Sequence, residues 1–179
     1  ASTAGAAPRN VLDLDIDALK ESLVGEKRHV AILVIHQRLS RQLDAEALVE
    51  RHAQIDAVTK TLARQWQASL HSRQGGFLTF LLGFERASQN DVLQAANFAL
   101  SLRDALQAID VSGAMSFGFA LSHGEVFSPD QSVERADGPM LTLATELARA
   151  ASSFAIVLGD ESRGDTIYYR LEPGFALSP

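Results

Sequence analysis

The sequence contains no cysteine, and this absence excludes disulfide scaffolds, thiolate metal ligands and a cysteine nucleophile. Such a composition is compatible with a reducing compartment, so we expect a cytoplasmic location. Basic residues are also few. The sequence has 16 Lys and Arg and 22 Asp and Glu, which gives a formal net charge of −6. Proteins that bind nucleic acids normally carry a stripe of basic residues that neutralises the negative charge of the phosphates. We therefore expect no nucleic-acid partner.

Long apolar runs and a signal pattern are missing too. The longest apolar stretches, at 30–35 and around 77–82, fall far below the roughly 20 residues that a membrane-spanning helix needs. The chain starts at Ala1 without an initiator Met and without a charged and then apolar leader. We therefore expect a piece of a longer protein, in which any membrane contact depends on a segment absent from this chain.

The first 28 residues are predicted to be a flexible lead followed by a short connector helix. Residues 1–10 are small and polar and include Pro8. Between Asp13 and Glu26 the apolar residues recur at near-helical spacing, and Gly25 is suited to end the helix. The folded domain is accordingly placed at residues 29–179.

Two elements at the start of this domain have clear patterns. Residues 29–35 are rich in β-branched and aliphatic residues without alternation, which is typical of a strand buried on both faces. Residues 44–70 carry apolar side chains every three or four positions, which predicts a long amphipathic helix, unbroken or interrupted once. A central strand followed by a covering helix is therefore expected.

Two hairpins are predicted from glycines that separate apolar strands. The first turns at Gly75-Gly76, and the second turns at 122–125, where the sequence is Ser-His-Gly-Glu. The strands and helices of this part are expected at 70–73, 77–82, 88–109, 114–121, 126–127, 140–151, 155–158 and 166–169. Their order is an α+β plan with one mixed, mostly antiparallel sheet covered by helices.

The element order and several short strings between His29 and Gly164 resemble the catalytic domain of class III adenylate and guanylate cyclases. The resemblance implies a ferredoxin-like, nucleotidyl cyclase-like fold and an active site formed between two subunits arranged head to tail. The strings are VAILV at 30–34, LDAEALV at 43–49, GGFL at 75–78, GFALSHGEV at 118–126 and the helix that follows Gly138.

In that family two Asp residues hold two metal ions, because cyclisation needs cations on the triphosphate and on the attacking ribose hydroxyl. The resemblance puts His36 at the first of these positions and Gly75 at the second. Glycine has no ligand atom, and imidazole suits transition metals rather than hard cations. A pair of hard cations is therefore not expected, and no metal or other cofactor is predicted.

Four further positions follow from the same resemblance. His71 stands where the family has its purine-contacting Lys, and Arg135 stands where it has the acidic or polar purine partner. Thr142 replaces the Asn that orients the ribose, and Glu146 replaces the Arg that stabilises the phosphate in the transition state. A carboxylate at the last position would repel a polyphosphate, which reverses the electrostatic contribution that usually dominates such catalysis.

The histidines allow other interpretations. His36 and His71 would lie close in this fold and could bind a transition metal, but no third ligand is apparent, so two polar residues lining a vacated cleft is the preferred interpretation. His123 and Glu125 fall in the predicted second turn, where exposed turn residues are the simpler explanation.

The preferred hypothesis is a catalytically inactive, cyclase-like regulatory module of a larger bacterial-type signalling or membrane-associated protein. Its expected role is dimerisation, with itself or with a related cyclase-like partner. The alternative is a binding module that holds a nucleotide or another small ligand through Arg135 and Arg73 without turning it over. An active cyclase with a rearranged site is the third hypothesis. The interface residues predicted for dimerisation are Phe77, Phe80, Phe119, Phe127 and Leu141.

Overall fold

The computed structural model describes residues 25–40, 43–110 and 113–159. Most of the predicted connector helix and the predicted strand at 166–169 lie outside the described residues. The first described strand, β1 (Glu26–Leu39), begins inside the range that sequence analysis assigned to the lead and connector. It is longer than predicted because it pairs with a neighbouring strand over its whole length.

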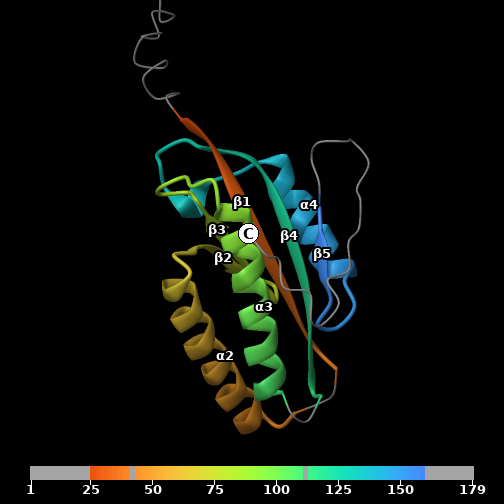
Figure 1. Ribbon diagram of the computed structural model, residues 1–179. Helices are drawn as coiled ribbons and strands as arrows, with labels where there is room; N and C mark the ends of the chain where they lie inside the picture. Colours follow the sequence, from red (N-terminus) through yellow and green to blue (C-terminus); the bar gives the residue numbers. More distant parts are fainter. Residues whose placement is uncertain (1–24, 41–42, 111–112, 160–179) are drawn as a thin grey trace, which may run out of the picture.

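A five-stranded sheet in the order β2-β3-β1-β4-β5 forms the centre of the domain (Figure 1). Its pairs are antiparallel except for β4 with β5, which are parallel. The predicted mixed, mostly antiparallel sheet is therefore confirmed. The other strands are β2 (Ser69–Gln74), β3 (Phe77–Leu82), β4 (Met115–Ser128) and β5 (Ile156–Leu158).

Helices cover both faces of this sheet. In Figure 1, α2 (Ala45–Gln65) and α3 (Asp91–Ile109) lie on one face, and α4 (Pro139–Ala150) lies on the other. The long helix α2 is unbroken, and the Asp44 side chain accepts a hydrogen bond from the Ala47 backbone N–H at 2.7 Å, which caps its first turn. Among the described residues, no helix has the length and the apolar composition to cross a bilayer.

The two faces of the sheet follow from the alternation of side chains along β1. One set, Ala31, Leu33 and Ile35, packs with α2 and α3 in the larger core cluster. The other set, Val30, Ile32 and Val34, packs with α4 in a second cluster. All six are fully buried, which confirms the predicted strand with two buried faces.

The predicted second hairpin is wrong. β4 runs without a turn from Met115 to Ser128 and pairs antiparallel with β1 through its whole length. Gly124, which suggested the turn, is extended and lies opposite Val30 in the ladder. Because β1 extends back to Glu26, every residue of β4 that was assigned to a turn has a partner opposite it in the antiparallel ladder.

Candidate functional site

His36 lies on β1 in a stack of three side chains. Its ring packs face to face on Phe77, the first residue of β3, with centroids 4.2 Å apart and an interplanar angle of 7°. The Arg149 guanidinium, from the last turn of α4, lies over the Phe77 ring at 5.3 Å from its centroid. His36 Nδ1 is buried, and no hydrogen-bond partner for it occurs among the described residues.

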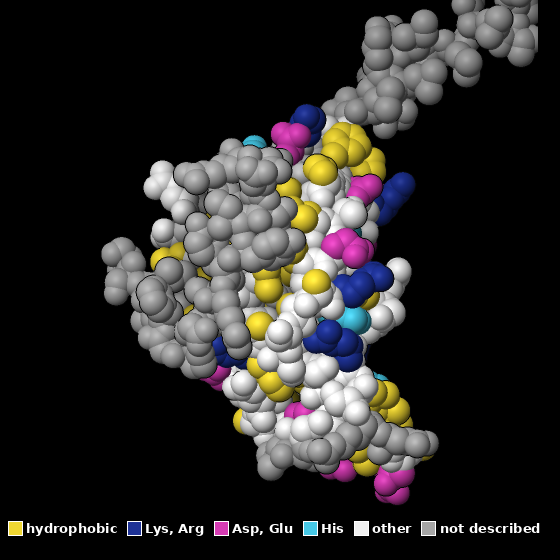
Figure 2. Space-filling model, turned by 90° about the vertical axis from the view of Figure 1, so that its right-hand side faces the viewer, with side chains coloured by type: hydrophobic (Ala, Val, Ile, Leu, Met, Phe, Trp, Pro, Cys, Tyr) yellow, Lys and Arg dark blue, Asp and Glu magenta, His cyan; other side chains and the backbone are white. Residues whose placement is uncertain are grey.

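Positive charge surrounds this stack. Arg38 donates hydrogen bonds to the backbone carbonyls of Ala151 at 2.8 Å and Arg149 at 3.2 Å, which holds its guanidinium against the end of α4. Burial lowers the pKa of His36, and the charges of Arg38 and Arg149 lower it further. On the face of the molecule that Figure 2 shows, Lys and Arg side chains gather next to a His side chain. The arrangement thus favours a neutral imidazole beside two cations.

Gly75 lies at the turn between β2 and β3, where its φ of +57° is in the left-handed region that glycine adopts at little cost. The turn is fixed against β1 by a hydrogen bond of 2.7 Å from the Gln37 N–H to the Gly76 carbonyl. A Cβ on Gly76 would come within 3.9 Å of the His36 ring. The structure therefore places the Gly75-Gly76 turn next to His36, so the two segments that the resemblance assigns to the metal ligands are neighbours.

These residues do not fit a pair of hard cations. Gly75 offers no side-chain ligand, and a dication beside His36 would be repelled by the charges of Arg38 and Arg149. Within 25–40, 43–110 and 113–159, no group of three or more His, Asp or Glu side chains is placed to hold a metal ion. His71 Nδ1 instead lies 2.6 Å from the Val133 carbonyl, and it lines a pocket that does not include His36.

A second group of predicted positions meets in a pocket of about 240 Å³ between β2, β3 and α4. His71, Thr142 and Glu146 all line it, and Asp137, which sequence analysis did not assign to the site, adds a second carboxylate. The pocket is lined by His71, Ser72, Thr79, Asp137, Leu141, Thr142, Thr145 and Glu146. Neither Lys nor Arg is among them, so its electrostatic character is unfavourable for a phosphate group.

Local sequence explains how α4 presents these side chains. Gly138 and Pro139 begin the helix, with Pro at a position where its missing N–H costs nothing. Thr142 and Glu146 are one helical turn apart on the exposed side, while Leu141 and Ala144 face the core. Glu146 also forms an ion pair of 3.6 Å with Arg149. That pair links the pocket to the His36 stack along one helix.

The two arginines assigned to phosphate binding lie elsewhere. Arg135 is exposed on the short helix η1 (Val133–Arg135), is not a lining residue of the His71 pocket, and pairs with Asp130 at 2.8 Å. Arg73 forms an ion pair with Asp56 of α2. Both guanidinium groups therefore already have a carboxylate partner.

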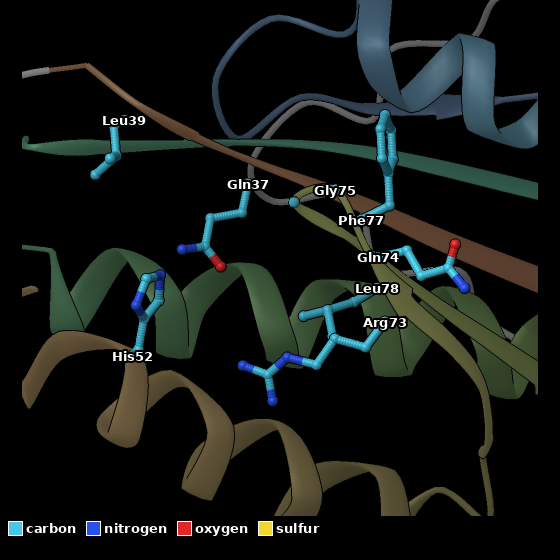
Figure 3. Close-up of a pocket in the computed structure, with 9 residues that line it drawn as sticks. Gln37, Leu39, His52, Arg73, Gln74, Gly75, Phe77 and Leu78 are labelled. Atoms are coloured by element: carbon cyan, nitrogen blue, oxygen red, sulfur yellow. The ribbon is translucent and has the colours of Figure 1, made fainter. Parts of the chain in front are cut away.

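Arg73 belongs to a separate open cleft of about 520 Å³ between α2 and the β2–β3 hairpin. Figure 3 shows Gln37 from β1, His52 from α2 and Arg73 from β2 directed into this space, with Phe77 pointing away from it towards α4. Sequence analysis did not assign Gln37 or His52 to a site. The only available signal was that His52 is a polar residue within the predicted long helix.

The predicted interface residues separate into buried and exposed ones. Phe80, Phe119 and Leu141 are core residues that are 1%, 0% and 7% exposed, so the prediction that they form an interface is wrong. Phe77 is half-buried and Phe127 is 41% exposed. These two lie on opposite faces of the sheet, because Phe77 is opposite His36 in the ladder and Phe127 is opposite Lys27.

No protein-family model and no curated protein matches this sequence. Solved structures with the same fold are nevertheless found. The guanylyl cyclase domain of the RhoGC fusion protein from the aquatic fungus Blastocladiella emersonii is 12% identical, with a TM-score of 0.65 over 75% of this chain and 83% of that one.

Two further cyclases give similar values. The adenylyl cyclase CyaB from P. aeruginosa is 15% identical, with a TM-score of 0.64 over 76% of this chain and 79% of its own. The guanylyl cyclase Cya2 is 20% identical, with a TM-score of 0.61 over 75% of this chain and 76% of its own. The described domain therefore has the fold of the class III adenylate and guanylate cyclase catalytic domains.

Proposed function

We propose that this chain is a non-catalytic, cyclase-like module that regulates a larger protein by pairing with a second copy or with a related domain. The fold supports its relation to nucleotide cyclases. The observation that carries the proposal is the replacement of a cation-binding centre by His36, Gly75 and the guanidinium groups of Arg38 and Arg149.

The physical reason to expect no catalysis is the sign of the charge around His36 and Gly75. Cyclisation of a nucleoside triphosphate needs cations to neutralise the phosphates and to activate the ribose hydroxyl. Here Arg38 and Arg149 lie beside His36, and the described part of the chain places no group of three or more His, Asp or Glu side chains to hold a metal ion. In the second pocket Glu146 and Asp137 add negative charge where a phosphate would need donors. The charges around His36 and those of the His71 pocket thus both oppose cyclisation of a nucleoside triphosphate. The carboxylates of the His71 pocket also argue against the alternative hypothesis of a nucleotide-binding module.

The first test is direct. We expect the purified protein, incubated with ATP or GTP and with Mg²⁺ or Mn²⁺, to form no more cyclic nucleotide than a blank without protein, as measured by mass spectrometry. His36→Ala is the control, because it removes the imidazole and should leave the blank level unchanged. Manganese-dependent cyclic product that disappears in His36→Ala would contradict the proposal, since it would show that this chain and not a contaminant is active.

Pairing is supported by the fold and by the chemistry of one face. Solved structures of the RhoGC guanylyl cyclase domain include a monomeric form and a dimeric form, so domains of this fold are compatible with both states. In this chain the half-buried Phe77, stacked between His36 and Arg149, is an aromatic residue beside the pocket of His71, Thr142 and Glu146. Aromatic residues and Arg are the residue types that most often dominate binding energy at interfaces.

We expect a dimer of twice 19.3 kDa in sedimentation equilibrium, and we expect Phe77→Ala to raise its dissociation constant by about tenfold or more. Phe127→Ala is the matched control, because it removes the same ring from the opposite face of the sheet. A wild-type monomer at all concentrations, or equal effects of the two variants, would count against pairing through this face.

A further inference from the structure

A third pocket lies on the opposite side of the β2–β3 edge from the pocket that contains His71. Thr79 of β3 lines the His71 pocket, whereas Leu78 and Phe80 line this one. The alternation of side chains along β3 therefore separates the two spaces. Its volume is about 270 Å³, and it is lined by Asp56, Thr59, Lys60, Ala63, Arg64, Ala68, Leu70, Arg73, Leu78 and Phe80.

The inner wall of this pocket is apolar. Ala63, Leu78 and Phe80 belong to the main core cluster, and Leu70, which also lines the pocket, is 44% exposed. Covering such surface is favourable because it removes apolar area from water. Concave, mainly apolar pockets with a few polar groups are typical binding places for small molecules.

One buried polar group in the wall also supports the binding of a ligand. Thr59 is 5% exposed, and its hydroxyl has no hydrogen-bond partner within the part of the chain that the structure describes. In many helices a threonine hydroxyl bonds to the carbonyl four residues back, as Thr61 does to Ala57 at 2.9 Å. An unsatisfied hydroxyl at a pocket wall is a group that a polar atom of a ligand can satisfy.

The rim is positively charged. Lys60 and Arg64 are one turn apart on α2, and Arg73 reaches the same rim from β2. The single carboxylate, Asp56, pairs with Lys60 at 2.7 Å and also with Arg73. The Arg64 guanidinium makes a hydrogen bond of 3.3 Å to the Lys60 carbonyl, and the described residues contain no acidic partner for it. Three cations against one carboxylate leave the rim suited to an anion.

We propose that this pocket binds a small amphipathic organic anion, an acyl or aryl carboxylate. Its apolar body lies against Leu70, Leu78 and Phe80, and its carboxylate faces Arg64 and Lys60 at the rim. Binding is non-covalent and involves neither the His36 stack nor the His71 pocket. The inference therefore goes beyond the proposed function, and either can fail without the other.

Octanoate is the probe for this site, with octan-1-ol and octyltrimethylammonium as uncharged and positively charged ligands of the same chain length. Titration of the whole chain is followed by amide chemical shifts in heteronuclear NMR. We expect octanoate to bind with a dissociation constant on the order of 1 mM or tighter and to shift the amides of 59–70 and 78–80. The alcohol and the ammonium compound should bind at least about tenfold more weakly.

Two exposed substitutions test the geometry. Arg64→Gln removes the rim charge and Leu70→Glu places an anion at the mouth, and each is expected to weaken octanoate binding by about tenfold. Arg86→Gln, an exposed arginine that does not line this pocket, should leave it unchanged. Undetectable octanoate binding, equal binding of the three chain-matched ligands, or equal affinity of Arg64→Gln and Arg86→Gln would each overturn the proposal. The unperturbed amide spectrum of each variant verifies its fold.

Discussion

Replacement of Gly118 by alanine is expected to lower the free energy of unfolding by about 3 kcal/mol. A Cβ at this position would lie 2.3 Å from the Ala148 carbonyl oxygen and 3.2 Å from the Ala151 Cβ. The obstacle is the backbone of the last turn of α4, which cannot move aside as a flexible side chain can. Helix α4 would have to shift away from β4 and loosen the second core cluster.

The matched control is Gly75→Ala, the same chemical change at a position where nothing lies within 4 Å of the added carbon. At Gly75 we expect the free energy of unfolding to fall by only about 1 kcal/mol, because alanine must adopt the left-handed φ of that residue. Urea unfolding is followed by the fluorescence of Trp66, the only tryptophan of the sequence, which packs against the main core cluster. If Gly118→Ala lowers the free energy of unfolding no more than Gly75→Ala does, then α4 does not pack tightly on β4.

The Phe98→Ala variant is expected to lose about 4 kcal/mol of unfolding free energy, the other large effect. Phe98 lies in α3, is 0% exposed and meets Phe80 edge to face, with ring centroids 5.2 Å apart at 85°. The substitution removes a buried ring from between α3 and the sheet and leaves a cavity that the surrounding side chains cannot close fully.

Phe127→Ala serves as the comparison, because Phe127 is 41% exposed and belongs to neither core cluster. The loss there should be about 1 kcal/mol or less. Chemical unfolding of both variants at equal protein concentration is the measurement, so that a change in pairing does not alter the comparison. Similar losses for the two phenylalanines would mean that α3 packs more loosely on the sheet than its burial indicates.

Much of the sheet could be predicted from local sequence. The aliphatic run of β1 indicated burial on two faces, and Gly75-Gly76 indicated the turn before β3, because both signals depend on residues close in the chain. The error at 122–125 has the opposite cause. Whether Gly124 turns or extends is decided by its pairing with Val30, which is remote in the chain.

The candidate site could be predicted only in part, for the same reason. The turn that contains Gly75 lies beside His36 because it leads into β3, which pairs with β1, as the resemblance implied. The charges around His36 were not foreseen, since Arg38 reaches the Arg149 carbonyl across 111 positions of sequence. The buried Phe80 and Phe119 were mistaken for surface residues because an aromatic strand residue has the same sequence signal on a core face as on an interface.

β1 joins the start of the described domain to His36 without an intervening loop. The ten residue steps from Glu26 to His36 span about 33 Å in an extended strand. β4 holds this length rigid on one side through an unbroken ladder. A shift of Glu26 along the strand axis would break this whole ladder, so the position of His36 is fixed relative to the start of the described domain and to Phe77, its ladder partner on β3.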